Sequence, residues 1–231
     1  LFRLQEFAIA LGWAPWTDLF RVDILNTIGA SMILMGVVCW GVLRISSGTR
    51  VRAKLAMGAA GMMALIAVLT PLVWTNWRIP HLPWEVESYI NGVHNLGQPQ
   101  AWLFPIFPWG GFAFAGLAGG FLLVSDYGKK TGARLFLAGI PIGLVLIYGA
   151  KFLDSRGVHL YAVYDFWHTS PNFFVMRVGF LLLFVVLAYG WCRWGWGARG
   201  FSPLIQMGNT SLLVYWVHIE LVYGRFHILP Q

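Results

Sequence analysis

The sequence predicts an all-α, polytopic transmembrane helix bundle, and three observations lead to this class. Charged side chains make up only 11% of the 231 residues, whereas about a quarter is usual in a soluble domain. Hydrophobic residues make up 58%, and 27 glycines add to them, which leaves more apolar surface than a globule of this length can hide from water. The apolar residues also gather into long runs. These features disfavour a water-soluble enzyme, a disordered tail and a disulfide-rich secreted module.

Each predicted span is a mostly apolar run between polar breaks, close to the roughly 20 residues that cross about 30 Å of hydrocarbon. Six complete runs occupy residues 22–43, 55–73, 102–124, 135–152, 173–194 and 208–226. A further run at 2–13 is too short and predicts a partial N-terminal span. Because the chain opens with Leu1 inside this run, we expect sequence upstream of it. Residues 1–231 are predicted to form a single, N-terminally incomplete transmembrane domain.

Lysine and arginine are unevenly divided between alternate loops, and this predicts the orientation. The richer set holds Arg44, Arg50, Arg52 and Lys54, then Lys129, Lys130 and Arg134, then Arg193 and Arg199. Since positively charged short loops stay cytoplasmic, we expect loops 44–54, 125–134 and 193–207 on that side of a bacterial inner membrane. Topology also explains the net charge of +7, so the predicted partner is the lipid bilayer and no nucleic-acid partner is predicted.

Metal, phosphate-loop and cysteine chemistry find no support in the sequence motifs. Gly-rich phosphate loops, Cys-x-x-Cys, His-Glu-x-x-His and Gly-x-Ser-x-Gly are absent from the sequence. The spacing of His159 and His168 matches no usual ligand pattern, so no metal is predicted. Two glycine pairs, Gly116 with Gly120 and Gly139 with Gly143, have the spacing that lets helix backbones approach closely.

Several polar residues fall within one layer near the predicted outer surface. Asp23 and Asn26 begin one span, Arg177 lies roughly 7 Å inside another, and Glu220 and His218 lie about 9 and 12 Å inside the last. Polar groups inside a bilayer mark either a structural pair or a functional pathway. Two interpretations stay open: Arg177 neutralises Asp23 or Glu220, or the layer is a buried polar site that opens outward.

The last span arranges its polar residues on one helical face. Ser211, Tyr215 and His218 follow spacings of four and three, whereas Glu220 lies roughly 200° around the helix from His218. His218 and Glu220 are therefore not expected to form a dyad. His218 is either a satisfied core group or a general base, and the base role needs an outward-open cavity. The candidate catalytic groups are His218 and Asp23, and the candidate substrate-binding residues are Asn26, Arg177, Tyr215, Ser211 and Glu220.

Five sequence runs resemble a known family. They are LFRLQE at 1–6, RVDILN at 21–26, FPIFPW at 104–109, SPNFF at 170–174 and, most specifically, GNTSLLVYWVH at 208–218. With them, the chain resembles bacterial members of the heparan-α-glucosaminide N-acetyltransferase-like family, within a wider group of polytopic transmembrane acyltransferases. The resemblance runs through nearly all of the chain.

The resemblance implies transfer of an acetyl group from cytoplasmic acetyl-CoA to an extracytoplasmic sugar or glycan. The family's catalytic histidine lies on an outward loop near the first span, and no residue of this chain matches that motif. Under this reading Arg44, Lys54, Lys129 and Arg134 attract the phosphates of CoA; as the alternative, they only determine topology. Trp84 and Tyr89 either stack on the sugar or anchor the chain at the interface.

Two functions of other classes remain as alternatives to the enzyme. One is a non-catalytic accessory subunit of a larger respiratory or photosynthetic membrane complex, with other membrane subunits as partners. The other is a permease. An upstream outward loop containing histidine favours the enzyme, stoichiometric co-purification with pigment or haem proteins favours the subunit, and transport into reconstituted vesicles favours the permease.

Overall fold

A computed structural model confirms the predicted all-α class. The structure describes residues 20, 22–46, 50–75, 80–92, 104–159, 161, 166–167, 169–195, 200–211, 213–215 and 217. Within these ranges the regular structure is helical, and no strand occurs.

Five of the six predicted spans are confirmed as helices that are long and apolar enough to cross a membrane. They are α2 (Ile24–Ile45), α3 (Val51–Thr75), α5 (Ile106–Val124), α6 (Asp126–Ser155) and α7 (Pro171–Trp194). The chain is therefore an integral membrane protein of helical type. The partial span at 2–13 lies outside the described residues, and so does most of the span at 208–226.

The chain divides into two compact units, residues 1–182 and 183–231. The first holds α2 to α6 and the first half of α7, and the second holds the rest of α7 and α8 (Pro203–Asn209). In the second unit Ser202 caps α8 by accepting from the Ile205 amide at 3.4 Å. The Trp191 indole donates to the same hydroxyl at 3.0 Å, which ties the end of α7 to the start of α8.

Two helix starts differ from the prediction. Helix α5 begins at Ile106 rather than 102, because it follows Pro105, and the backbone at Phe107 is still non-helical. Helix α6 begins at Asp126 rather than 135, so residues 126–134, predicted as a loop, belong to a helix. The Ser125 hydroxyl caps this early start by accepting from the Gly128 amide at 3.1 Å, and the helix is broken at Gly132 (φ 14°, ψ −95°).

A short helix, α4 (Trp84–Asn91), lies in the segment predicted as the loop 74–100. The Asn91 side-chain amide donates to the Val73 carbonyl at 3.1 Å and holds α4 to the end of α3. Trp84 packs edge-on against Phe20 with ring centroids 5.9 Å apart. The polar face of α4 is turned inward, since Glu87, Ser88 and Asn91 are buried.

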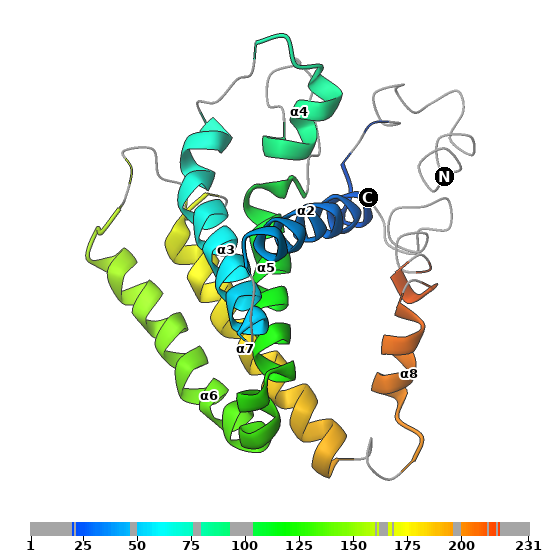
Figure 1. The fold of residues 1–231 in the computed structure, drawn as a ribbon. Coiled ribbons are helices and arrows are strands. Elements are labelled where there is room, and N and C mark those ends of the chain that lie inside the picture. The colour runs from blue at the N-terminus through cyan, green and yellow to red at the C-terminus, as the bar shows by residue number, and fades with distance from the viewer. Residues whose placement is uncertain are drawn as a thin grey trace. The chain divides into compact units, whose positions relative to one another are not determined.

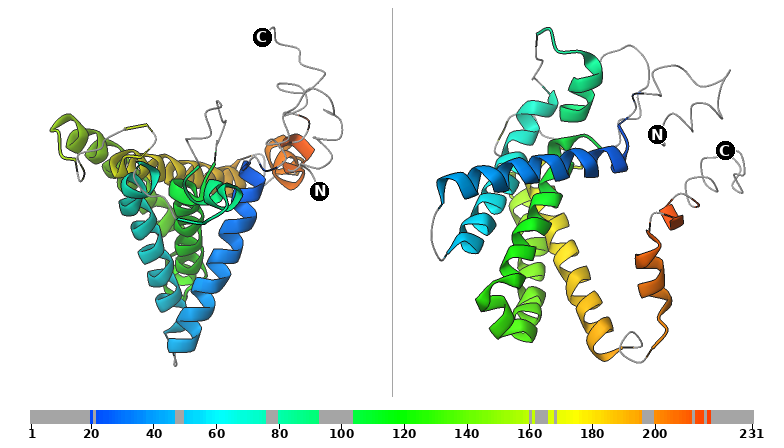
Figure 2. Two further views of the ribbon diagram at one scale, coloured as in Figure 1. Left: turned by 90° about the horizontal axis from the view of Figure 1, so that it is seen from above. Right: turned by 45° about the vertical axis from the view of Figure 1, so that its right-hand side comes forward.

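The core of the first unit lies between α2, α3 and α5. Figure 1 shows α3 and α5 side by side, and Figure 2 shows α2 and α3 converging at their sequence-adjacent ends. Phe114 of α5 is fully buried against Ala59 and Ile66 of α3. Half-buried Leu34, Met35 and Val38 of α2 pack on the same cluster. Phe114 is thus the side chain through which three spans meet.

Glycines permit the closest approach between α6 and α7. A Cβ atom on Gly179 would lie 2.8 Å from the Gly143 carbonyl oxygen and 2.9 Å from Ile147 Cγ1. Gly143, one member of the predicted Gly139 and Gly143 pair, therefore lies at a helix contact. At Gly116 and Gly120 an added Cβ would meet nothing within 4 Å among the described residues, so this second pair marks no such contact there.

Candidate functional site

The helices of the first unit alternate in direction, which gathers their ends in two places. We call these the aromatic end and the basic end. The aromatic end carries the starts of α2, α5 and α7 with the ends of α3 and α6, and the basic end carries the end of α2 with the starts of α3 and α6.

Arg177 is held at the aromatic end by two rings. Its guanidinium carbon lies 4.1 Å from the ring centroid of Phe173, one helical turn earlier in α7. The same carbon lies 4.9 Å from the ring centroid of Trp109 in α5. Such contacts contribute about 0.5–1 kcal/mol at exposed sites and about 2 kcal/mol when desolvated. The guanidinium is therefore stacked between two helices.

The two rings belong to a larger aromatic cluster made of Phe104, Trp109, Phe112, Phe173 and Phe174. Phe104 and Trp109 meet edge to face at 5.0 Å, and Phe112 stacks on Phe174 at 4.5 Å. A Cβ atom on Gly111 would lie 2.7 Å from the Phe174 ring, so a glycine is needed where α5 meets α7. The cluster joins the starts of α5 and α7 and fixes the position of the Arg177 stack.

Arg177 forms no ion pair with any carboxylate in the described part of the chain. Of the two partners suggested for Arg177, Asp23 is therefore not paired with it in that part of the chain. The Asp23 carboxylate instead caps α2 by accepting from the Ile24 amide at 2.6 Å, because short polar side chains satisfy the free amides at a helix start. The alternative partner, Glu220, lies outside the described residues.

The start of α2 is nevertheless attached to the aromatic cluster. The buried Thr27 hydroxyl donates to the Phe104 carbonyl, and Phe104 in turn contacts Trp109. Asn26 lies half-buried in the first turn of α2. The structure thus brings the helix that starts with Asp23 and Asn26 to the cluster that holds Arg177, through a threonine that the sequence did not single out.

The remaining candidate catalytic and acceptor-binding residues belong to the second unit. Ser211 is exposed and Tyr215 is half-buried, both in helical residues that follow α8. His218 lies outside the described residues, so its predicted role stays a prediction.

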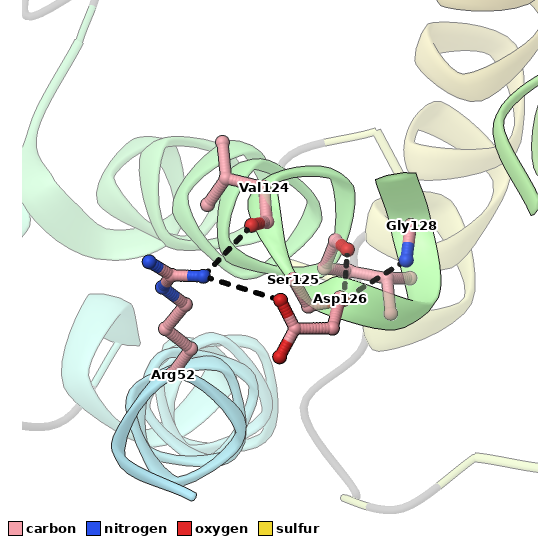
Figure 3. Close-up of polar contacts among 6 residues, drawn as sticks. Arg52, Val124, Ser125, Asp126 and Gly128 are labelled. Carbon is pink, nitrogen blue, oxygen red and sulfur yellow. Dashed lines mark hydrogen bonds and ion pairs between the residues drawn. The ribbon is translucent and has the colours of Figure 1, made fainter. Parts of the chain in front are cut away.

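At the basic end, one arginine joins the start of α3 to the junction of α5 and α6. Figure 3 shows Arg52 reaching from α3 toward the Val124 carbonyl and the Asp126 carboxylate. Arg52 Nη1 lies 3.4 Å from the Val124 oxygen and 3.7 Å from Asp126 Oδ1. Asp126 is the one acidic residue in segments 44–54 and 125–134, so this end keeps a strong positive charge.

The four residues predicted to attract CoA phosphates lie on segments that meet at the basic end. Arg44 stands in the last turn of α2 with its guanidinium 5.1 Å from the Trp40 ring centroid. Lys54 is half-buried in the first turns of α3, and Lys129 and Arg134 are exposed in α6. These cations can attract an anion from water, and as loop charges they also determine topology.

Replacing Arg52 with glutamine is expected to change stability only slightly. Its side chain is 55% exposed and that of Asp126 is 89% exposed, so water screens the pair. The free energy of unfolding in detergent micelles should fall by no more than about 0.5 kcal/mol. The matched control is Arg50→Gln, two residues earlier and just before α3. A loss above about 2 kcal/mol for Arg52→Gln alone would show a stronger role for the contact than its exposure indicates.

No protein-family model, curated protein or solved structure matches the chain. Any role of the aromatic and basic ends therefore rests on the chemistry of their own residues. Over the residues that the structure describes, no group of three His, Cys, Asp or Glu side chains is placed to hold a metal ion.

Sequence reasoning singled out Arg177 but missed the rings that hold it. Phe173 could have been found, because residues four apart on a helix are neighbours. Tryptophan is typical of the membrane interface in general, and nothing local in the sequence connects Trp109 to Arg177. Its role depends on the packing of α5 against α7.

Proposed function

We propose that this protein is an integral membrane acyltransferase that moves an acetyl group from cytoplasmic acetyl-CoA to an extracytoplasmic sugar or glycan. The proposal rests on the resemblance of the five sequence runs. It is supported by one structural observation, the division of a single helical unit into a basic end and an end that holds a stacked arginine.

The basic end suits the donor. CoA carries phosphate groups, and Arg44, Lys54, Lys129 and Arg134 supply cations on the segments that meet there. Charge-assisted contacts to phosphate are among the stronger hydrogen bonds of proteins, and arginine makes them bidentate. Asp126 offsets only one of the positive charges of these segments.

The aromatic end suits a polar acceptor. Arg177 offers guanidinium donors there, and the Asp23 carboxylate lies at the start of the neighbouring helix α2. Transfer of an acetyl group to an amine or hydroxyl needs a base that takes the acceptor's proton. The sequence suggests His218 as that base, with Asp23 as the second candidate, and suggests Asn26, Ser211, Tyr215 and Glu220 as acceptor contacts.

The test uses the full-length protein in sealed, inside-out membrane vesicles with labelled acetyl-CoA outside. Label is expected in a glycan or lipid-linked sugar recovered from the vesicle interior, and His218→Ala should abolish it. Absence of transferred label, in vesicles where a known membrane acetyltransferase is active, would contradict the proposal.

A paired variant at the basic end tests the donor site separately. Lys129→Gln combined with Arg134→Gln should raise KM for acetyl-CoA roughly tenfold while kcat stays near its original value, because only donor binding loses contacts. Arg156→Gln, at the end of α6, is the control and should leave KM unchanged. An equal KM in all three proteins would remove these cations from the donor site.

The second candidate is a non-catalytic subunit of a larger membrane complex, and the exposure of α2 favours it. Only 6% of the apolar window of α2 is buried within the chain. Ile33, Met32 and Trp40 are all more than half exposed. Lipid, neighbouring subunits or segments outside the described residues must cover these side chains, and stoichiometric co-purification with haem or pigment proteins after mild detergent extraction would favour the subunit.

A further inference from the structure

Arg177 is a cation inside a membrane-spanning helix, and no carboxylate among the described residues lies against it. It stands six residues after Pro171, the first residue of α7, which places it about 9 Å along the helix. A charged side chain at such a position is costly unless it pairs with an opposite charge or reaches the headgroup layer. In the described part of the chain the guanidinium has ring contacts and no carboxylate.

Among the described residues, the ring contacts leave the donors of the guanidinium without an acceptor. Phe173 and Trp109 lie against its carbon at 4.1 and 4.9 Å and orient the group, but the faces of aromatic rings accept no strong hydrogen bond. Arginine has five N–H donors in a planar fork that matches the oxygens of phosphate. An arginine that is stacked on rings, and that meets no carboxylate in the described ranges, is therefore pre-organised for an anion.

Phosphate is the anion that the location favours. Arginines near the ends of membrane helices extend toward the interface, where the phosphate groups of lipids lie. The amphipathic ring of Trp109 is typical of the same level. Since α7 contributes 24 residues, about 36 Å of helix, it exceeds a hydrocarbon layer of about 30 Å by about one turn, which leaves Arg177 within reach of the headgroups.

We propose that Arg177, stacked between Trp109 and Phe173, binds the phosphate group of a membrane lipid at the aromatic end of the first unit. Two kinds of lipid present this group, a glycerophospholipid and a lipid-linked sugar carrier of the polyprenyl phosphate type. The proposal does not depend on acetyl transfer. If the carrier is the preferred lipid, the site also positions an acceptor for the proposed reaction, and this added step does rest on the proposed function.

The experiment measures retained lipid by native mass spectrometry of the full-length protein released from detergent micelles. Three probes are added separately: phosphatidylglycerol, a polyprenyl phosphate, and diacylglycerol as the phosphate-free control. Wild type should retain one or both phosphate lipids and should not retain diacylglycerol. The more strongly retained of the two phosphate lipids identifies the source of the phosphate.

Variants then assign the binding to the residue. Arg177→Gln should weaken retention of the phosphate lipid roughly ten- to hundredfold, the range of a lost charge-assisted hydrogen bond. Arg177→Lys keeps the charge but not the planar fork, so it should weaken retention several-fold less. Arg156→Gln is the matched control, because Arg156 also lies over a phenylalanine ring, that of Phe152 at 5.1 Å, yet stands in the exposed turn after α6.

Folding and an internal counter-charge are tested in the same series. Trp109→Phe keeps an aromatic ring, so it is the variant to measure if Arg177→Gln lowers the yield of folded protein. Its lipid retention should fall, but less than that of Arg177→Gln. Unchanged lipid retention in Arg177→Gln would overturn the proposal. A second result would also overturn it. If Arg177→Gln lowers thermal stability, if adding Glu220→Gln restores that stability, and if lipid retention stays the same in all these variants, then Glu220 is the counter-charge of Arg177.

Discussion

Replacing Gly179 with leucine is expected to destabilise the protein by more than about 3 kcal/mol. The first side-chain atom would already lie 2.8 Å from the Gly143 carbonyl oxygen and 2.9 Å from Ile147 Cγ1. A backbone oxygen in a helix cannot move aside as the end of a side chain can, so α6 and α7 must separate. Overpacking of this kind costs about 1–3 kcal/mol for a small added group, and a whole leucine should exceed this.

The loss should appear as a lower midpoint of unfolding in an SDS titration of the protein in mixed micelles. The same substitution at Gly116 provides the control, since an added Cβ there meets nothing within 4 Å among the described residues. Gly116→Leu should be neutral or slightly stabilising, because leucine favours helix over glycine by up to about 1 kcal/mol. Equal destabilisation of both variants would contradict the α6–α7 contact.

Replacing Phe114 with alanine is the second large expected effect. The ring is fully buried where α5 meets Ala59 and Ile66 of α3, with side chains of α2 around it. In soluble cores the same change costs about 3–5 kcal/mol. Within a bilayer the ring leaves one apolar medium for another, so the transfer contribution is small and the lost van der Waals contacts remain. We expect a loss of about 2–3 kcal/mol.

The SDS titration again supplies the measurement, and a substitution on an outward surface supplies the control. Phe184→Ala removes the same ring from a side chain of α7 that is 65% exposed. Its free energy of unfolding should change by less than about 0.5 kcal/mol. A smaller loss for Phe114→Ala than for Phe184→Ala would contradict the assigned core.

The positions of the spans could be predicted because the signal is local. A helix in lipid satisfies its own backbone, so the length of an apolar run determines whether it crosses. Five predicted spans became helices for this reason. The start of α6 was misplaced because Lys129, Lys130 and Arg134 were interpreted only as loop charges, whereas Ser125 caps a helix that carries them.

Partners within the candidate site could not be predicted in the same way. Asp23 and Arg177 both fall in the predicted outer layer of their spans, and this alone suggested an ion pair. Rotation about each helix axis and the order in which helices pack decide which side chains meet, and neither follows from depth. In the structure Asp23 caps its own helix, while Arg177 faces Trp109.

By itself the sequence determined that this protein is a helical membrane protein, where most of its spans lie, and which ends of those spans carry the basic residues. These properties depend on composition and on the spacing of residues close in the chain. Only the tertiary structure decided that Gly179 contacts Gly143, that Phe114 joins three spans, and that Arg177 is stacked on a ring of α5. Such contacts join residues far apart in sequence, because lipid makes every apolar helix face nearly equivalent until shape and polar groups select a neighbour.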